Sequence, residues 1–341
     1  MRIAYDVTPL SHPRTGVGNY ILGTLKGMLA AALGEHDFVA FGPVSIRGRR
    51  LLADTLAGLP IERRLLTVPF AHATRRAWGA LGHPVAEQVL GGLDVLHFSD
   101  WMTPPQRGGV RATMIHDLGP LRFPERLHPR TVSMHAGTAR AAASCDVVFT
   151  NSEFTAADIV ELLGLPRERV RVAYPGVDAS FSPEGDRRDL GKPYVFTTAT
   201  ADWRKNRAAL DAAMSLLGSE LTLAALGSGG LGFVRDEDLP ALYRGAEVFA
   251  YPSRFEGFGI PVVEAMACGV PCVVSSHPSL DEACGGAAVR ADPESPEELA
   301  AGIERAIAER DELIARGLAH ARRFDWNETG RIHLQSYADA L

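Results

Sequence analysis

The stretch YPSRFEGFGIPVVEAMACGVP, from Tyr251 to Pro271, decides the fold. It reads as the end of a strand, a glycine-bearing loop, and a helix with proline in its first turn and glycine where it ends. A strand, a tight loop and a helix in this order build parallel sheets with helices on both faces. The loop also presents backbone N–H groups at the helix N-terminus, where an anion is favoured.

Two carboxylates stand eight positions apart in this stretch. Glu256 lies in the loop, just before Gly257 and Gly259, and Glu264 lies in the first turns of the helix. Glycines let a ligand approach the backbone closely. A carboxylate at Glu264 can accept hydrogen bonds from a vicinal diol such as a ribose edge, and Glu256 can accept them from sugar hydroxyls. Taken singly, each is equally well explained as a helix N-terminal acid or a solvated loop residue.

Outward from this stretch, short apolar runs alternate with helical segments, which predicts an α/β protein. In the first half the predicted strands are 2–6, 38–41, 95–98, 112–115, 147–150 and 170–172, and the predicted helices are 20–33, 131–144 and 153–163. In the second half the predicted strands are 194–198, 221–226, 248–251 and 272–275, and the predicted helices are 207–217, 239–244, 261–268, 296–323 and a last one after 326.

A length of 341 residues predicts two domains, at roughly 150 residues each. The polar segment 176–193, which holds prolines and glycines, is the best linker candidate. The predicted organisation is therefore a first domain over 1–175, this linker, a second domain over 194–324, and a final helix over 325–341 that crosses back to the first domain.

Net charge divides unevenly between the halves. Residues 1–175 hold 19 basic and 15 acidic side chains, and the remainder holds 16 and 26, so the halves carry +4 and −10. The basic half suits an anionic partner such as a phosphorylated acceptor or a membrane surface, although solvated faces explain the difference equally well. Nucleic-acid binding is not expected, because the arginines are scattered without an aromatic stacking platform.

The N-terminal residues turn polar too soon for a signal peptide, and no apolar run reaches the ~20 residues that span a bilayer. We therefore expect a cytoplasmic protein. The cysteines are Cys145, Cys268, Cys272 and Cys284. Their spacing fits neither a metal site nor a secreted disulfide framework, so we expect buried free thiols.

A second cluster of candidate site residues, Thr200 to Asn206, follows the strand predicted at 194–198. Ligands of α/β proteins bind at the carboxyl ends of parallel strands. The cluster contains Arg204 and Lys205, and Lys205 is one of only three lysines beside 32 arginines. A preorganised cation there would stabilise a departing diphosphate, whereas an ordinary surface turn is the alternative reading.

Two further motifs lie at strand ends of the first half. Gly16 and Gly18 stand between the first strand and first helix, where backbone can approach a phosphate or an acceptor, or simply turn. His116 follows the strand at 112–115 and could bind a metal, act as a base or bind a sugar, and a purely structural role is about as common for such a histidine. His97 also ends a strand, and for it we favour a structural role.

Two other motifs imitate known sites. The glycines of 227–232 formally fit GxGxxG, but no helix is predicted at the last glycine and no ribose-binding acid follows the next strand. A nicotinamide cofactor is therefore not expected. The triplet 236–238, Asp-Glu-Asp, imitates a metal-binding DxD motif, but we read it as the cap of the helix that begins at Leu239.

The 251–271 stretch resembles glycosyltransferase family 4 of the GT-B fold. The signature of that family is two glutamates separated by seven residues in a sequence like this one. The resemblance covers nearly the whole chain and extends to 14–20, 238–246 and 275–282. It implies two Rossmann-like, doubly wound domains with an interdomain cleft, the first on the acceptor side and the second holding a nucleotide-sugar donor. It also implies no metal ion and no cofactor beyond the donor.

The resemblance further implies residue roles. Glu256 would contact the donor sugar and Glu264 the ribose, while the backbone of Phe258, Gly259 and Ile260 would contact sugar and phosphates. Arg204 and Lys205 would grip the diphosphate near Thr200. Gly16, Gly18 and His116 would contact the donor from the first domain. This chain departs from the family in having Ala199-Thr200 in place of a Gly-Arg pair and a shortened 227–235 connection.

The expected reaction transfers a hexose, as mannosyltransferases do, from a nucleoside diphosphate to an acceptor hydroxyl with retained configuration. The acceptor would be a small molecule, a glycan or a lipid-linked molecule, with peripheral membrane contact through the first domain. A nucleotide-sugar epimerase on the same scaffold and a non-catalytic sugar-nucleotide binding protein remain as alternatives. Base, sugar, acceptor, linkage and oligomeric state are not written in any motif.

Overall fold

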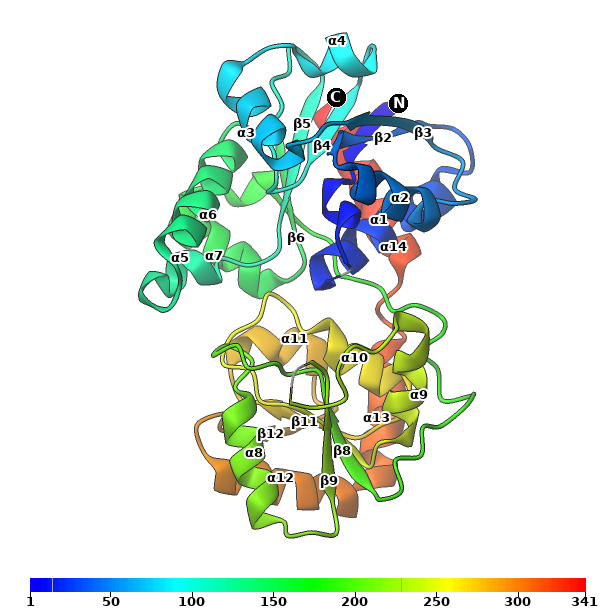
Figure 1. Cartoon of the computed structure of the whole chain (residues 1–341), viewed down its shortest axis with the longest axis vertical. Coiled ribbons are helices and arrows are strands. Elements are labelled where there is room, and N and C mark those ends of the chain that lie inside the picture. Colours follow the sequence, from blue (N-terminus) through cyan, green and yellow to red (C-terminus); the bar gives the residue numbers. More distant parts are fainter. Residues whose placement is uncertain (14, 228) are drawn as a thin grey trace. The chain divides into compact units, whose positions relative to one another are not determined.

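The computed structural model describes residues 1–13, 15–227 and 229–341, with the side chains of Arg130 and Met134 left out. It divides into two compact units (Figure 1). Unit 1 comprises Met1–Gly176 and Trp326–Leu341, and unit 2 comprises Val177–Asp325. Each unit is built on one wholly parallel sheet, as the alternation of strands and helices predicted.

Unit 1 contains a seven-stranded sheet with the strand order β3-β2-β1-β4-β5-β6-β7. Its strands are β1 (Arg2–Asp6), β2 (Asp37–Val44), β3 (Glu62–Thr67), β4 (Val95–Phe98), β5 (Val110–Ile115), β6 (Val147–Thr150) and β7 (Val170–Val172). Its α-helices are α1 (Gly16–Ala32), α2 (Ile46–Thr55), α3 (Ala71–Leu81), α4 (Ala86–Leu90), α5 (Gly119–Arg122), α6 (Pro129–Ala142), α7 (Glu153–Leu163) and α14 (Trp326–Ala340).

Both faces of this sheet are buried, which explains why its strands read as short apolar runs rather than alternating ones. On β1, Ile3 and Tyr5 belong to one hydrophobic core and Ala4 belongs to another. β3, which the sequence did not predict, is an edge strand with exposed arginines. Charged edge strands lack the apolar signal that identifies central ones.

The last helix of the chain, α14, packs on α1 and completes the core of unit 1 (Figure 1). Glycines allow the close approach: a Cβ on Gly27 would lie 1.8 Å from the carbonyl oxygen of Trp326, and one on Gly330 would lie 2.1 Å from the carbonyl carbon of Gly27. The Thr329 hydroxyl donates to Tyr174 O at 2.5 Å. Unit 1 is therefore assembled from both ends of the chain.

Unit 2 contains a five-stranded sheet with the order β12-β11-β10-β8-β9. Its strands are β8 (Tyr194–Thr197), β9 (Thr222–Ala225), β10 (Val248–Tyr251), β11 (Cys272–Ser275) and β12 (Val289–Ala291). Its α-helices are α8 (Arg207–Leu216), α9 (Leu239–Gly245), α10 (Ile260–Ala267), α11 (Asp281–Cys284), α12 (Pro296–Ala308) and α13 (Arg310–Ala321).

The helix predicted at 296–323 is wrong in one respect, because the structure breaks it at Glu309 into α12 and α13. α12 packs on α8 and on the sheet, whereas α13 packs on α10. Arg310 holds the break by donating to the Glu247 carbonyl at 2.7 Å. No glycine or proline marks this position, so only tertiary packing decides it.

The segment expected to be a linker, 176–193, is fastened to unit 2. The guanidinium of Arg244, on α9, donates to the carbonyl oxygens of Ser180, Ser182 and Asp186 at 3.4, 3.2 and 2.7 Å. This side chain is buried, so the carbonyls replace its lost hydration. The polar composition of the segment thus reflects bonding to a buried arginine and not freedom from the domain.

All four cysteines are free thiols and buried, as predicted. Burial raises the pKa of Cys145 and of Cys268 to about 12, which leaves both thiols protonated. Within the described residues, none of the helices combines the length and the hydropathy needed to cross a membrane.

Candidate active site

The candidate site of unit 2 forms where β8 and β10 end. These strands are parallel neighbours, so the loops that follow them emerge at the same edge of the sheet. The loop after β8 carries Lys205, and the loop after β10 carries Glu256. Two clusters that are about 50 residues apart in the sequence are thereby brought into contact.

Lys205 and Glu256 form an ion pair, with 2.7 Å between Nζ and Oε1. The same ammonium donates to the Tyr251 hydroxyl at 2.7 Å. Burial would lower the pKa of Lys205, but its interactions with Tyr251 and Glu256 outweigh burial, so the pKa lies above its usual value. The lysine is therefore charged at neutral pH, with 24% of its side chain exposed against 12% for Glu256.

Neighbouring residues fix both loops. Asn206 is the N-cap residue of α8 and has a positive φ of 53°, and its side-chain amide donates to the carbonyl oxygens of Pro252 and Pro293 at 3.3 and 2.6 Å. The backbone N–H of Glu256 donates to the Ser279 hydroxyl at 3.0 Å. The pair is thus held by bonds to both neighbouring loops, which limits the reorganisation needed when a ligand binds.

Glu264 lies on α10 and is half-buried. The Tyr243 hydroxyl donates to its Oε2 at 3.0 Å. Burial raises the pKa of Glu264 to about 7, the bond from Tyr243 opposes this, and the nearby charges of Asp236 and Asp178 add to it. Glu264 therefore changes between carboxyl and carboxylate near neutral pH. A hydrogen-bond donor, such as a ligand hydroxyl, brought close to it would favour the carboxylate.

The loop between the two glutamates offers backbone and not side chains. Phe258 is buried against Phe324, with 5.3 Å between ring centroids, so its side chain belongs to the core. Gly259 has a φ of 105°, and a Cβ there would lie 2.6 Å from Leu280. The next residue, Ile260, starts α10 and is half-buried. The predicted role of these three residues through main-chain groups fits this geometry.

The remaining predicted residues of unit 2 lie in the loop after β8. Thr200 is exposed, and Arg204 is half-buried. The Arg204 carbonyl accepts from the N–H of Arg254 at 2.7 Å, which ties this loop to the one after β10. Arg204 Nε lies 3.7 Å from a carboxylate oxygen of Asp202. Arg204 is therefore a neighbour of the Lys205–Glu256 pair, and Thr200 lies farther out on the surface of the loop.

The predicted residues of unit 1 also lie at strand ends. His116 follows β5 and contacts the Tyr20 ring edge to face, with 5.2 Å between ring centroids. Burial lowers the pKa of His116 to about 4, so the imidazole is neutral at physiological pH. A neutral imidazole can donate and accept hydrogen bonds but contributes no charge.

Gly16 and Gly18 lie in the first turn of α1, which begins four residues earlier than predicted. Thr15 caps this helix, and its hydroxyl oxygen accepts from the N–H of Gly18 at 3.4 Å. A Cβ on Gly16 would meet none of the described atoms within 4 Å, so this turn faces open space. Arg14, which begins the matching motif, lies outside the described residues.

His97 is structural, as favoured from the sequence. It is buried, its Nδ1 lies 2.6 Å from the Tyr337 hydroxyl, and its ring stacks on Phe149 and His333. These contacts place it in the core between β4 and α14. The pKa of His97 lies well below its usual value because of burial.

The two imitation motifs serve local structure. Gly227 and Gly232 form an antiparallel bridge, and α9 begins only at Leu239, so the strand-to-helix geometry of a dinucleotide site is absent here; Ser228 lies outside the described residues. The triplet 236–238 forms a 3-10 turn before α9. Its predicted capping is wrong in detail, because Asp238 stands at the N-cap without a side-chain cap and instead pairs with Arg235 at 2.8 Å.

Sequence reasoning missed three contributors to the site. The Tyr251 hydroxyl accepts from Lys205, and the Tyr243 hydroxyl donates to Glu264. The Ser279 hydroxyl accepts from the backbone N–H of Glu256. Tyr251 was visible as the last residue of a strand that ends beside the loop, but the position of Tyr243 depends on the packing of α9 against α10. Among the described residues, no three His, Cys, Asp or Glu side chains are grouped as a metal site.

Family models match most of the chain. A model described as Glycosyltransferase Family 4 matches residues 15–181, and one described as Glycosyl transferases group 1 matches residues 228–323. The chain is 28% identical to the O-antigen chain mannosyltransferase B of Escherichia coli, over 99% of each chain. It is also 28% identical to a D-inositol 3-phosphate glycosyltransferase of Salinispora tropica, over 99% of this chain and 85% of that protein.

Solved structures share the fold over nearly the full length. Sucrose-phosphate synthase from Thermosynechococcus elongatus aligns with a TM-score of 0.76 at 17% identity, over 99% of this chain and 98% of that one. Anabaena HepE in complex with UDP-glucose aligns with a TM-score of 0.70 at 16% identity, over 99% of this chain and 100% of that one. The strand order and the two-sheet organisation are therefore those of GT-B enzymes.

Proposed function

Since the chain belongs to the family 4, or group 1, glycosyltransferases of the GT-B fold, we propose that it transfers a hexosyl group from a nucleoside diphosphate sugar to an acceptor hydroxyl, with retention of anomeric configuration and without a metal ion. The mannosyltransferase similar over the full length makes mannose the first sugar to test. The HepE complex supports a nucleoside diphosphate as the carrier.

The observation that carries this proposal is the Lys205–Glu256 pair at the ends of β8 and β10. Breaking the bond between the anomeric carbon and the diphosphate places negative charge on the leaving group. A fixed ammonium beside that group stabilises the transition state, and removing one such donor typically costs about 2.7–4 kcal/mol. Lys205 is charged and held by two partners, which suits this task.

The roles of the other residues follow from their chemistry. The carboxylate of Glu256 accepts hydrogen bonds from sugar hydroxyls, while the backbone N–H groups at the start of α10 face the phosphates. Glu264 accepts hydrogen bonds from the ribose diol. From unit 1, neutral His116 binds a sugar hydroxyl, and the turn at Gly16 and Gly18 binds phosphate or sugar. Arg204 and Thr200 line the phosphate side.

In the proposed reaction the acceptor oxygen attacks the anomeric carbon on the face that the diphosphate leaves. The new C–O bond forms as the bond to the phosphate oxygen breaks, and the acceptor's proton passes to that departing oxygen. Atoms and charge balance without an enzymic nucleophile. The two-carboxylate arrangement of retaining hydrolases is not required, and the protein contributes positioning and charge.

The direct test incubates the protein with GDP-mannose or UDP-glucose and a mannoside acceptor, with and without EDTA, and follows the product by NMR. We expect one product with the donor's anomeric configuration and equal rates in both buffers. An inverted product, or activity only with added Mn²⁺, would overturn the mechanism. An isomerised donor without transfer would indicate an epimerase, and tight binding without turnover would indicate a binding protein.

A thermal-shift panel of nucleoside diphosphates would identify the base. A nucleotide present at 100 times its dissociation constant adds about 2.7 kcal/mol of apparent stability. We expect one base to stand apart from the others. If no nucleoside diphosphate raises the melting temperature, the proposed donor is wrong.

A further inference from the structure

Residues 46–89 of unit 1 expose apolar side chains more densely than the rest of the chain. Among the described residues, twelve large hydrophobic side chains are exposed, and five of them fall in this segment of 44 residues. They are Ile46, Leu66, Phe70, Leu81 and Val89, and their exposed fractions range from 41% to 79%. Leu66, Leu81 and Val89 also line one pocket, so these three are neighbours in space, as exposed apolar residues at interaction surfaces are.

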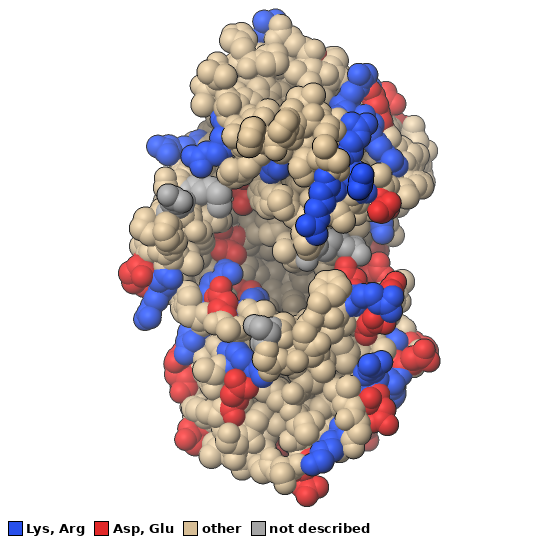
Figure 2. Space-filling model, in the orientation of Figure 1, with Lys and Arg blue, Asp and Glu red and all other residues tan. Residues whose placement is uncertain are grey.

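The same segment carries the whole excess positive charge of the first half. It holds seven arginines against Asp54, Glu62 and Glu87, whereas the remaining residues up to 175 hold twelve basic and twelve acidic side chains. Six of the seven arginines are exposed, and Arg75 is the buried one. Figure 2 shows basic side chains gathered over α2 and β3.

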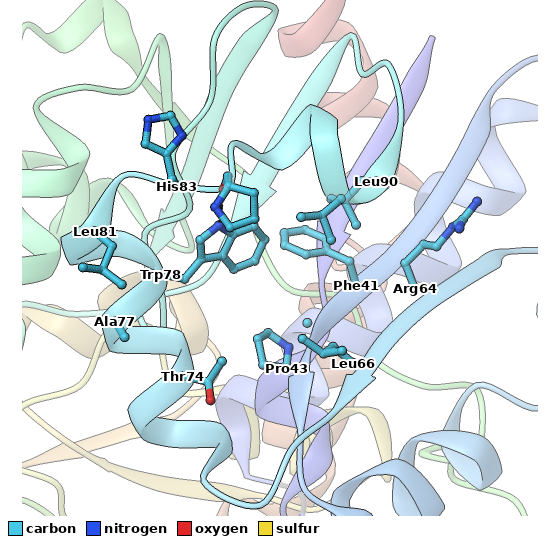
Figure 3. Close-up of a pocket in the computed structure, with 13 residues that line it drawn as sticks. Phe41, Pro43, Arg64, Leu66, Thr74, Ala77, Trp78, Leu81, His83 and Leu90 are labelled. Atoms are coloured by element: carbon cyan, nitrogen blue, oxygen red, sulfur yellow. Dashed lines mark hydrogen bonds between the residues drawn. The ribbon is translucent and has the colours of Figure 1, made fainter.

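An apolar pocket of about 220 Å³ opens between α3 and the strands β2 and β3 (Figure 3). Its floor is formed by Phe41, Pro43, Trp78 and Leu90, and Leu66 and Leu81 stand at its sides. Two of its polar groups bond within the protein: the Trp78 indole N–H donates to Pro84 O at 2.5 Å, and the Thr74 hydroxyl donates to Phe70 O at 3.1 Å. Arg64 and His83 are the charged and titratable side chains among the lining residues, which are otherwise mostly apolar. The pocket therefore suits a hydrocarbon and not a sugar.

Arg64 lines the same pocket, is exposed, and forms an ion pair with Glu62 on its own strand. A cation beside an apolar cavity matches a molecule with an anionic head and a hydrocarbon tail. Exposed arginines on the adjoining α2 and α3 extend the positive field around it. Basic and apolar groups together are the composition of surfaces that bind anionic membranes.

We propose that the 46–89 surface docks on a bilayer containing anionic phospholipids, with one acyl chain entering the pocket beside Trp78 and with Arg64 and its neighbours facing lipid phosphates. The contact is peripheral, in keeping with the finding that none of the described helices can span a membrane. None of the residues assigned to sugar transfer belongs to this surface, so the inference stands independently of the proposed reaction.

The first experiment is flotation of the full chain with phosphatidylcholine vesicles, with and without phosphatidylglycerol. We expect binding only when phosphatidylglycerol is present, and weaker binding as salt rises. Arg64→Gln should lower the partition coefficient about fivefold, as expected for one basic side chain near the surface. Leu81→Asp should lower it about tenfold or more.

Matched controls lie on unit 2. Arg305→Gln removes an exposed arginine and Leu216→Asp alters a leucine that is 58% exposed, and neither should change vesicle binding. Transfer to a water-soluble acceptor in the absence of vesicles should be equal for all four variants. Circular dichroism should show that Leu81→Asp folds normally; if it does not, Arg64→Gln still tests the charge requirement.

The second experiment places the acyl chain. Phosphatidylglycerol brominated on its acyl chains should quench the fluorescence of Trp78, and Trp78→Phe should abolish most of that quenching while vesicle binding persists. Absence of binding to either vesicle, or binding that both Arg64→Gln and Leu81→Asp leave unchanged, would overturn the proposal. So would a dimer that Leu81→Asp dissociates without any vesicle binding, because a second copy would then be the partner.

Discussion

The two parallel sheets of this chain end in different chemistry. In unit 2 the loops after β8 and β10 present a charged pair, Lys205 and Glu256, fixed by Tyr251 and by neighbouring loops. In unit 1 the corresponding edge presents the neutral imidazole of His116 and an open glycine turn at Gly16. Both edges are the binding edges of α/β sheets, but of the described residues assigned to the site, those of unit 2 include an ion pair and those of unit 1 are neutral.

This difference indicates that the two units have different roles, although both have the same architecture. A preorganised cation is needed where negative charge develops, whereas neutral hydrogen-bonding groups suffice where hydroxyls are held. Substitutions in unit 2 should therefore change the reaction rate, and those in unit 1 should change binding or folding.

The largest effect is expected for Lys205→Ala. Losing the only cation bonded to Glu256 in the described site should lower kcat by about 10²–10³, as for the loss of one oxyanion donor. Lys192→Ala is the matched control, because that lysine is exposed and donates to a backbone carbonyl, Ser219 O, at 3.4 Å. Steady-state kinetics with saturating donor decides the matter, and a Lys205→Ala enzyme of near-normal kcat would break the contrast.

Glu256→Gln should lower kcat/KM by about 10–100-fold. The amide keeps the shape but loses the charge-assisted bond to Lys205, which is worth about 1.5–3 kcal/mol. Because the unpaired ammonium would then bind diphosphate more tightly, the affinity for free nucleoside diphosphate should rise while turnover falls. Calorimetry and kinetics on the same preparation measure both, and equal losses in both quantities would refute this account.

Gly330→Ala should destabilise unit 1 by about 1–3 kcal/mol, because its Cβ would lie 2.1 Å from the backbone of α1 and cannot be accommodated by a rotamer change. Urea denaturation measures the loss. Gly137→Ala is the control: its Cβ would meet none of the described atoms within 4 Å, so the same change in α6 should stabilise by about 0.5–1 kcal/mol. Equal effects at the two positions would show that α14 packs loosely.

The smallest effect concerns Glu264, whose pKa is raised to about 7 by burial. A protonated carboxyl accepts hydrogen bonds from ribose hydroxyls poorly, so the affinity for a nucleotide sugar should fall as the pH is lowered through 7, by at most about tenfold per pH unit, and should be constant above that range. Glu264→Gln should flatten this dependence, and so should a 2′-deoxy donor bound to the unaltered protein. Isothermal titration at several pH values provides the measurement.

Much of the fold was predictable because both sheets are buried on both faces. The strands β1, β4, β6, β7, β10 and β11 have the bounds predicted for them. The edge strands β3 and β12 escaped prediction because charged or very short strands lack a periodic apolar signal. The break at Glu309 also escaped it, since the two halves of that helix pack against different partners.

The site was predictable only where a single segment of the sequence contains the functional residue and its structural context. Lys205, Glu256 and Glu264 were identifiable as residue types in loops after strands, and the structure brings the first two into contact. Tyr243 and Ser279, which bond to Glu264 and Glu256, come from other elements of the fold, so only the folded chain reveals them. The roles of Lys205, Glu256 and Glu264 in sugar transfer stay predictions, which the substitutions at these positions test.

The chain enters unit 2 at Val177 and leaves it after Asp325, and the N–H of Val177 donates to the Phe324 carbonyl at 3.2 Å. Unit 2 is thus inserted within unit 1, whose helix α14 follows unit 2 in the sequence. During translation, unit 2 has its complete sequence before unit 1 does. Until α14 emerges from the ribosome, the glycine face of α1 is uncovered and Tyr337, the hydroxyl partner of His97, is missing, so nascent unit 1 should bind chaperones.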